Sequence, residues 1–371
     1  MDSKSSHLPN ILFIVCLSCQ YFNFSSGIAD TEAEYNRWIS WHVKNHQRKT
    51  TMRGNSANQG PNLDDKLLNA EKKKTTLIVS QDGTGDFKTI NEAIASIPKH
   101  NTRRVILNIK PGLYREKVNI TKDKPFITFF GDSGSENPPT ISWNDTAEIV
   151  NKTLNSASVI ASADYFVAIN MKFENTAPHY ENGSEKQQAA AIRISGNKAA
   201  FYNCTFLGKQ DTLYDHKGMH YFNNCYIQGS VDFICGHALS LYEKCVLNST
   251  ADKMGFLTAQ NRSNATMESG FSFKDCLVTG SGLIYLGRTW GDYSRVVFSY
   301  TFMDKIVLPK GWSEMGGHPK NHSTVYYGEY KCEGPGSNLT GRVPWSKNLT
   351  DAEAKPFIGD YFVDGDTWLI Y

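Results

Sequence analysis

The stretch Phe201-Tyr202-Asn203-Cys204-Thr205-Phe206 carries a frame of one apolar residue, two mostly polar positions, a cysteine, a variable residue and a second apolar residue. Three further copies begin at Phe222, Tyr242 and Phe273, and their cysteines are Cys225, Cys245 and Cys276. The first two intervals between cysteines are nearly equal and the third is longer, as a loop insertion would make it. A short strand that recurs in this way, with no helix long enough for a crossover, predicts an all-β solenoid of parallel coils.

The recurring cysteines would occupy the same position in successive coils and would therefore stack in the core. We expect them to act there as small buried apolar residues. A disulfide between Cys245 and Cys276 is the alternative, because an oxidising compartment would permit it.

The N-terminal part of the chain, up to Lys74, differs from the rest. Residues 1–27 combine a weakly basic start, the apolar run 11–17 and small residues at 25–27, which is the pattern of a secretory signal peptide. The apolar run is shorter than the roughly 20 residues that span a bilayer, so no membrane segment is expected. Residues 28–74 are polar and basic and predict a linker or N-terminal extension. The remaining residues, 75–371, would form one domain.

Numerous Asn-x-Ser/Thr sequons favour a secreted, extracellular glycoprotein. Among them are those that begin at Asn119, Asn144, Asn151, Asn182, Asn248, Asn261, Asn321, Asn338 and Asn348. Asn203 also begins a sequon, but it lies in a strand-like run and is expected to stay unmodified. Residues 1–74 contain 10 Lys and Arg against 7 Asp and Glu, which leaves the main domain near neutral, so no nucleic-acid partner is indicated.

Two short helices are predicted at the ends of the main domain. Thr89 and Glu92 form a capping box before a helical apolar face, and this helix would cover the first coil. Thr350 and Glu353 form a second capping box near the C-terminus, which predicts a small helical segment there.

Two carboxylates, Asp211 and Asp232, lie in mainly apolar or aromatic settings. Gln188, Gln210 and Asp232 follow one another at equal intervals, each close to the length of one coil, so one groove would present them side by side. Arg288 and Trp290 add a cation and a flat apolar surface. From spacing alone, an ordinary turn with a structural amide ladder is favoured over a functional site.

Several separated blocks, in order, resemble the signature blocks of plant pectinesterases (pectin methylesterases). They are Gly112–Glu116, Gln188–Arg193, Gln210–Leu213, Asp232–Gly236, Leu286–Trp290 and Tyr326–Tyr330. The resemblance covers roughly residues 75–371 and implies a right-handed parallel β-helix, in agreement with the repeats. Residues 28–74 are too few for the inhibitor-like pro-region of many members, so the chain resembles the short form.

The resemblance implies hydrolysis of the C6 methyl ester of galacturonate in pectin, in the plant cell wall, with methanol released and a carboxylate left. By position, Asp232 would be the nucleophile and Asp211 the general acid and then the base. Gln188 and Gln210 would form the oxyanion hole, and Arg288 would orient Asp232. The resemblance implies no cofactor and no metal.

Substrate contacts would come from Trp290, Arg288, Gln188 and Tyr214. The implied partners are pectin (homogalacturonan) and, as a further candidate, a proteinaceous pectinesterase inhibitor. We expect a monomer, because a solenoid with covered ends needs no partner, and the basic residues 28–74 would touch pectate in the wall.

The implied chemistry has definite electrostatic requirements. A carboxylate attacks an ester carbonyl only while it is ionised, and we expect Arg288 to lower the pKa of Asp232 and to fix its rotamer. The second carboxyl, Asp211, must be protonated to donate to the departing methanol.

Four positions depart from the family pattern: Cys235 replaces Phe, His237 replaces Asn, Thr289 replaces Pro and Met315 replaces a frequent Trp. We expect Cys235 to weaken a sugar subsite, and Thr289 to loosen Arg288 and Trp290 by freeing a backbone torsion. No proposed catalytic side chain is lost, so an active enzyme with altered affinity or pattern of action is predicted.

Two alternatives remain open: a β-helix pectate lyase or polygalacturonase, and a catalytically weakened pectin-binding relative. His216 and His220 lie close together in sequence, but no third ligand is placed nearby, so we expect structural roles for them rather than metal binding.

Overall fold

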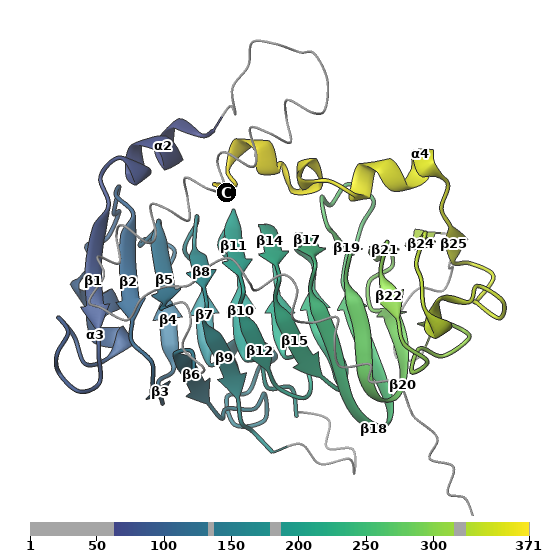
Figure 1. Ribbon diagram of the computed structural model, residues 1–371, viewed down its shortest axis with the longest axis horizontal. Helices are drawn as coiled ribbons and strands as arrows, with labels where there is room; N and C mark the ends of the chain where they lie inside the picture. Colours follow the sequence, from purple (N-terminus) through teal and green to yellow (C-terminus); the bar gives the residue numbers. More distant parts are fainter. Residues whose placement is uncertain (1–62, 133–136, 179–186, 315–323, 371) are drawn as a thin grey trace, which may run out of the picture.

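The computed structural model describes residues 63–132, 137–178, 187–314 and 324–370, and it is a parallel β-helix (Figure 1). The predicted solenoid is confirmed. The predicted signal peptide, most of the linker, the sequons at Asn182 and Asn321, and Met315 lie outside the described residues.

One continuous parallel sheet forms the first face of the solenoid, and each coil adds one strand to it. In spatial order its strands are β1 (Thr75–Val79), β2 (Val105–Ile109), β5 (Ile127–Gly131), β8 (Val167–Ile169), β11 (Ala199–Tyr202), β14 (Met219–Asn223), β17 (Leu239–Glu243), β19 (Gly270–Lys274), β21 (Arg295–Ser299), β24 (Tyr326–Tyr330) and β25 (Lys347–Asn348).

A second parallel sheet has two arms, which form the other two faces and join at the long strand β18 (Val246–Gln260). One arm contains β3 (Leu113–Tyr114), β6 (Thr140–Trp143), β9 (Lys172–Asn175), β12 (Thr205–Leu207) and β15 (Tyr226–Gly229). The other arm contains β4 (Val118–Ile120), β7 (Val159–Ala161), β10 (Ile192–Ile194), β13 (Leu213–Asp215) and β16 (Val231–Gly236). Strand β20 (Leu277–Thr289) follows β18 and pairs further with β22 (Phe302–Met303) and β23 (Trp312–Ser313).

Stacked aromatic rings run through the core along the solenoid axis. Rings of successive coils stack at centroid distances of 4.9, 4.5, 4.6 and 4.5 Å, because in-register parallel strands place equivalent side chains above one another. The stack is Phe201, Phe222, Tyr242, Phe273 and Phe298. The first residue of each repeated frame therefore is an inward core residue, as predicted.

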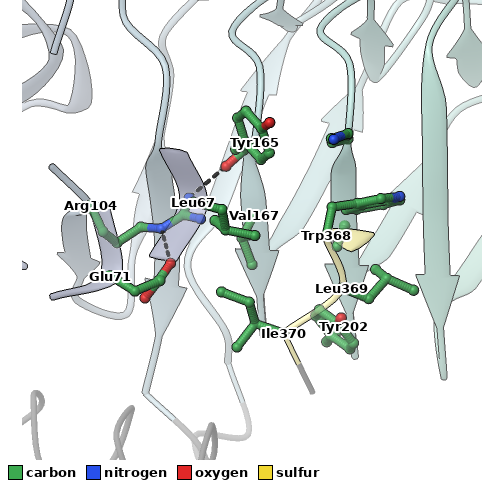
Figure 2. Close-up of a pocket in the computed structure, with 11 residues that line it drawn as sticks. Leu67, Glu71, Arg104, Tyr165, Val167, Tyr202, Trp368, Leu369 and Ile370 are labelled. Atoms are coloured by element: carbon green, nitrogen blue, oxygen red, sulfur yellow. Dashed lines mark hydrogen bonds and ion pairs between the residues drawn. The ribbon is translucent and has the colours of Figure 1, made fainter. Parts of the chain in front are cut away.

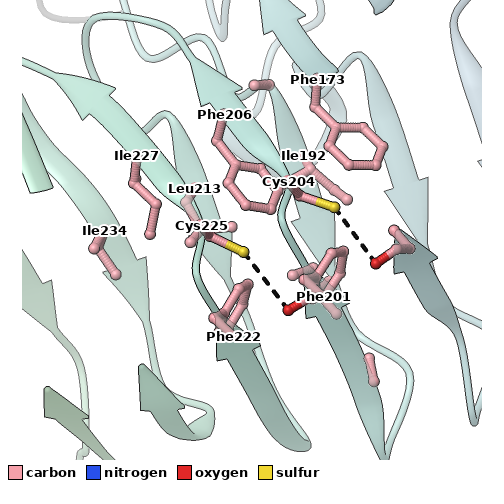
Figure 3. Packing of buried hydrophobic residues seen from close by; sticks show 14 of the residues in the cluster. Phe173, Ile192, Phe201, Cys204, Phe206, Leu213, Phe222, Cys225, Ile227 and Ile234 are labelled. Atoms are coloured by element: carbon pink, nitrogen blue, oxygen red, sulfur yellow. Dashed lines mark hydrogen bonds between the residues drawn. The ribbon is translucent and has the colours of Figure 1, made fainter. Parts of the chain in front are cut away.

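The cysteine of each frame lies beside this stack and follows a sharp turn (Figure 3). The residue before each cysteine has a left-handed backbone, with φ from 51° to 56° at Asn203, Asn224, Lys244 and Asp275. Asparagine and aspartate tolerate this conformation better than most residues, which explains the polar positions of the frame.

The cysteine sulfurs donate to backbone carbonyls of the preceding coil, as Cys204 does to Ala168 at 3.4 Å and Cys225 to Phe201 at 3.6 Å (Figure 3). The predicted stack of buried cysteines is confirmed. The alternative of a Cys245–Cys276 disulfide is wrong: both thiols are free and buried, and each bonds to a carbonyl of the coil before it.

The helix α3 (Ile90–Ser96) begins at the predicted capping box, with Thr89 and Glu92 bonded reciprocally. Its buried residues Ile90, Ala93 and Ile94 join the core beside β1, so α3 covers the first coil as expected. Both carboxylate oxygens of Glu116 accept bonds from the first backbone N–H groups of this helix at 2.9 Å. The early Gly112–Glu116 block thus stabilises the fold.

A helix that the sequence pattern does not predict, α2 (Asp65–Glu71), lies within residues 28–74. Leu67 and Ala70 are buried against the outer side of the first sheet, and Arg104 bonds to Glu71 at 2.8 Å and to the carbonyl of Tyr165 at 2.5 Å (Figure 2). The linker assignment is therefore wrong for residues 63–74.

The C-terminal segment runs back along the same sheet toward α2 (Figure 1). It begins at the predicted capping box of α4 (Asp351–Ala354) and continues through the 3-10 turns η4 (Lys355–Phe357), η5 (Asp360–Val363) and η6 (Gly365–Thr367). Short 3-10 turns elsewhere are η1 (Thr153–Asn155) and η3 (Pro335–Ser337). Trp368 and Leu369 pack into one apolar cluster with Leu67, and the amide of Asp64 bonds to the carbonyl of Thr367 at 2.8 Å.

Candidate active site

The cleft on the outer side of the β4–β16 arm encloses about 170 Å³. It is lined by Thr153, Gln188, Gln210, Asp211, Tyr214, Asp232, Cys235, Gly236, His237, Ala259, Asn261, Arg288 and Trp290. Every site residue predicted from the sequence is among them. Because parallel coils keep register, residues that are one coil apart in sequence become neighbours on this face.

One column of outward side chains forms the middle of the cleft. Strand register pairs Tyr214 with Cys235, Cys235 with Ala259, and Ala259 with Arg288, so these side chains follow one another along the solenoid axis. Burial raises the pKa of Tyr214 to about 12, so its phenol stays protonated and able to donate over the physiological range.

Asp211 and Asp232 hold equivalent positions in adjacent coils. Gln210 bridges to Val231, and the amide of Asp211 donates to the carbonyl of Val231 at 3.1 Å, which places each acid next to its counterpart. Both have left-handed backbones, with φ of 59° at Asp211 and 50° at Asp232. Aspartate tolerates this conformation better than most residues, as it does at the coil turn of Asp275, and here it turns each carboxyl at an equivalent point of its coil.

A register shift between Val231 and Ile234 accompanies the unusual backbone of Asp232. The shift is a β-bulge, which reorients the side chain relative to a regular strand. Gly236 ends the same strand at a φ of 119°, and a Cβ there would lie 2.0 Å from the carbonyl oxygen of Asp215. Only glycine fits this close approach, which accounts for the last residue of the Asp232–Gly236 block.

Arg288 binds Asp232 through two parallel hydrogen bonds. Its Nε donates to Oδ1 of Asp232 at 2.8 Å, and its Nη2 donates to Oδ2. The guanidinium also lies 4.8 Å from the ring centre of Trp290 and 5.1 Å from that of Phe256, both within cation–π range. Tyr327, in the late Tyr326–Tyr330 block, donates to the carbonyl of Arg288 at 2.9 Å.

The two carboxyls have unequal electrostatic surroundings. Burial raises the pKa of Asp211 well above its usual value, and the neighbouring Asp232 raises it further. Burial also raises the pKa of Asp232, but the hydrogen bonds and the charge of Arg288 oppose that rise. Arg288 thus lowers the pKa of Asp232, as expected, but burial raises that pKa by more, so the pKa stays above its usual value. The expected difference between the two acids remains, because the pKa of Asp211 is raised more than that of Asp232.

The two glutamines are neighbours across adjacent coils. The amide of Ala189 donates to the carbonyl of Gln210 at 3.1 Å, which sets Gln188 beside Gln210 in the backbone ladder. Both side chains line the cleft together with the two acids. The predicted grouping of amides and carboxyls is thus present in the structure.

Three of the family departures, Cys235, His237 and Thr289, lie in or beside the cleft. Cys235 is 7% exposed and occupies the column between Tyr214 and Ala259, and its smaller side chain leaves room there. Thr289 is fully buried within β20 and pairs with Gln260, so its backbone is part of a regular ladder. The structure therefore gives no sign of the loosening expected at Thr289.

A second row of side chains, which we call the rim row, was not predicted as a unit. It consists of the residues that directly follow the last residues of β13, β16, β18 and β20: His216, His237, Asn261 and Trp290. Backbone bonds hold the row together, as from the amide of His237 to the carbonyl of His216 at 3.1 Å. The register that aligns Tyr214 with Arg288 also aligns the residues that follow these strands, so the rim row could have been predicted from it.

His216 and His220 do not form a metal pair. His220 is fully buried, with Nδ1 2.5 Å from the carboxylate of Asp215 and Nε2 2.8 Å from the carbonyl of Gly196. Tyr242 donates a hydrogen bond to the same Asp215 carboxylate. These bonds connect three successive coils. No three His, Cys, Asp or Glu side chains cluster as metal ligands within the described ranges. None of the helices in that part of the chain is long and apolar enough to cross a membrane.

A parallel β-helix that presents a paired aspartate centre with amide donors and an arginine defines a class of carbohydrate-active hydrolase sites. Comparison with known proteins specifies the class. The profile of the pectinesterase family matches residues 76–366, and the chain belongs to this family of carboxylic ester hydrolases.

Named relatives agree with this assignment. Pectinesterase QRT1 of Arabidopsis thaliana is 46% identical over 307 residues, which cover 81% of this chain and 80% of that protein. The solved structure of pectin methylesterase from carrot is 34% identical, with a TM-score of 0.73 over 79% of this chain and 94% of that one. A pectin methylesterase solved in complex with a hexasaccharide is 28% identical, with a TM-score of 0.66 over 79% of this chain and 98% of that one.

Proposed function

We propose that this enzyme removes the C6 methyl esters of galacturonate in pectin, with Asp232 as nucleophile and Asp211 as proton carrier. The observation that carries the proposal is the inequality of two acids in adjacent coils. Asp232 is held bidentately by Arg288, whereas Asp211 has no ion-pair partner among the described residues and a strongly raised pKa. One carboxyl is thereby favoured as the anion and the other as the acid.

In the first half of the reaction, the carboxylate of Asp232 attacks the ester carbonyl carbon. The carbonyl oxygen becomes an oxyanion, and the side-chain N–H groups of Gln188 and Gln210 are the donors suited to receive it, because they carry no charge to be desolvated. Collapse of the intermediate breaks the bond to the methoxy oxygen, which takes the proton of Asp211 and leaves as methanol.

In the second half, water attacks the acyl group that is bound to Asp232. Asp211, now ionised, accepts one proton from this water, and collapse of the second intermediate frees the carboxylate of Asp232 and the new carboxyl of the sugar, which releases the remaining proton to solvent. Arg288 keeps the departing carboxylate in position throughout, and Trp290, 45% exposed, offers a flat face to a sugar ring.

Methanol release from highly methylesterified pectin tests this proposal. We expect activity in the wild type, a loss of at least about 10³-fold in Asp232→Asn, and a similarly large loss in Asp211→Asn. Circular dichroism must show that both variants keep the β-helix. Full activity of Asp232→Asn would refute the assignment of the nucleophile.

The same assay separates the esterase from the other candidates. A lyase or a galacturonase shortens the polysaccharide, so unchanged chain length with released methanol excludes both, and insensitivity to a chelator argues against a calcium-dependent lyase. A weakened binding relative would retain pectin without releasing methanol. The family assignment favours the esterase over these alternatives.

We further propose that the protein is secreted to the plant cell wall as a glycosylated monomer, and that a proteinaceous inhibitor is a candidate partner. The apolar run 11–17 and the sequons support this proposal. Asn119, Asn144, Asn151, Asn338 and Asn348 are exposed and open to a glycan. Recovery of the protein from wall extracts, with an N-terminus near residue 28, and a monomeric mass in solution are the expected results.

A further inference from the structure

His237 presents an unused polar group to the cleft. It is half-buried, it lines the cleft beside Asn261 and Trp290, and neither ring nitrogen has a hydrogen-bond partner among the described residues. An imidazole that lines a binding cleft and makes no hydrogen bond to the described residues is available to a ligand that enters the cleft.

The neighbouring His216 holds the imidazole of His237 in place. The two rings meet edge to face, with centres 5.0 Å apart and an interplanar angle of 80°. Nδ1 of His216 is in turn 2.9 Å from the hydroxyl of Ser195, and its ring packs against Tyr214 at 5.3 Å. His237 is therefore a fixed feature of the rim row rather than a freely rotating surface side chain.

We propose that His237 binds the free carboxylate of a galacturonate unit next to the one being hydrolysed, and that it makes the affinity for partly de-esterified pectin increase as the pH falls. This inference rests on the proposed function. A methyl ester offers only a neutral acceptor to the imidazole, whereas a carboxylate forms a charge-assisted hydrogen bond with the imidazolium. His237 would thus distinguish a methylated neighbour from a demethylated one.

The charged groups around His237 determine the direction in which its pKa is shifted. Around His237 lie Asp215, His216 and Lys217 from the preceding coil, Asp232 and Cys235 on its own strand, and Arg288 two coils further on. Burial lowers the pKa of His237, Lys217 lowers it further and Asp215 opposes them. The imidazole of the free enzyme is consequently neutral at pH 7 and becomes a cation only in acid.

A bound carboxylate favours the protonated imidazole and raises its pKa, so carboxylate binding and proton uptake support each other. The sugar carboxylates stay ionised above about pH 4.5, since simple carboxyls titrate near 3.5 to 4. Between pH 7.5 and pH 5 the sugar carboxylates keep their charge, so any change of charge in this pair is a change at the histidine. An ion pair at a partly exposed site is worth up to about fivefold in affinity.

The test compares KM for half-methylesterified pectin with KM for fully methylesterified pectin from pH 5 to pH 7.5. Titration of the catalytic acids changes both KM values alike, so it cancels in their ratio. In the wild type the ratio should fall about three- to fivefold from pH 7.5 to pH 5. In His237→Asn it should not change with pH, and in His237→Arg, which keeps the cation, it should stay low throughout.

His100→Asn is the matched control, since His100 is an exposed histidine on the N-terminal side of the solenoid and its φ of 57° suits asparagine. It should reproduce the wild-type ratio at every pH. A His237→Asn enzyme that kept the pH-dependent ratio would overturn the proposal.

Binding of a de-esterified oligogalacturonate, measured calorimetrically at pH 5 and pH 7.5, separates this proposal from the proposed function. It requires no turnover, so absence of methanol release would refute the esterase alone. Loss of the acid-favoured binding in His237→Asn supports the role of His237, and equal binding by the two proteins at both pH values refutes it.

Discussion

Replacing Arg288 with glutamine isolates the energetic cost of the buried Asp232 carboxylate. Asp232 is 4% exposed and both of its oxygens accept bonds from Arg288, so the variant leaves an anion in the protein without its cation. Loss of one partner of a buried ion pair costs about 3–5 kcal/mol. For a domain of this size, that corresponds to a Tm about 6–10 °C lower at neutral pH.

The penalty should depend on pH with a definite sign. Burial already raises the pKa of Asp232 in the folded protein above its unfolded value, and removal of Arg288 raises it further. A carboxyl with a raised folded pKa loses stability as the pH rises from its unfolded pKa to its folded pKa. The Tm difference between wild type and Arg288→Gln should therefore be largest at pH 7.5 and should shrink toward pH 4.

Thermal unfolding followed by circular dichroism measures this difference, with Arg288→Gln/Asp232→Asn as the matched control. The double variant has no buried charge left unpaired, so it should recover most of the lost Tm at pH 7.5. If the single variant is no less stable than the double variant at pH 7.5, then Asp232 is not carried as a buried anion and the assignment of charge in the site is wrong.

Four further results are expected. Gln210→Ala should lower kcat by about 10²–10³ with the fold retained by circular dichroism, as for loss of an oxyanion donor, and an unchanged kcat would exclude that role. Tyr327→Phe should lower the free energy of unfolding by about 1 kcal/mol in urea titrations, because the Arg288 carbonyl loses its donor, and a variant as stable as wild type would contradict this. Peptide mass spectrometry should find Asn203 unmodified, since its amide bonds to Asn170 and Asn224, and Asn261 unmodified in active enzyme, since a glycan would fill the cleft; glycans at either site would be inconsistent with the structure. Non-reduced peptides should contain Cys245 and Cys276 as free thiols rather than as a linked pair.

The repeats were predictable because parallel in-register coils impose one rule at every position. Phe201 and Phe222 stack because they are one coil apart in sequence. The same spacing brings Gln188, Gln210 and Asp232 together on the outer face, so their grouping could be predicted from the sequence. The capping box at Thr89 is equally local, since both partners lie within one helical turn.

What the sequence did not reveal depends on contacts distant along the chain. Helix α2 buries only Leu67 and Ala70, too few for an amphipathic pattern, and its stability comes from Arg104 and the C-terminal residues. The net pKa of Asp232 required knowledge of its burial. The bulge at Asp232 and its left-handed backbone arise from register in three dimensions, which residue type alone does not encode.

The C-terminal segment has a consequence for how the molecule comes apart. In a plain solenoid each coil contacts only its neighbours, so coils can peel from an end one at a time. Here Trp368 and Leu369 share a cluster with Leu67 while η5 touches β14 and β17, so one segment bridges coils that are remote along the axis. A coil at the end of the solenoid cannot unfold unless the C-terminal segment also detaches from the middle coils. We therefore expect one concerted unfolding transition in place of stepwise loss of coils.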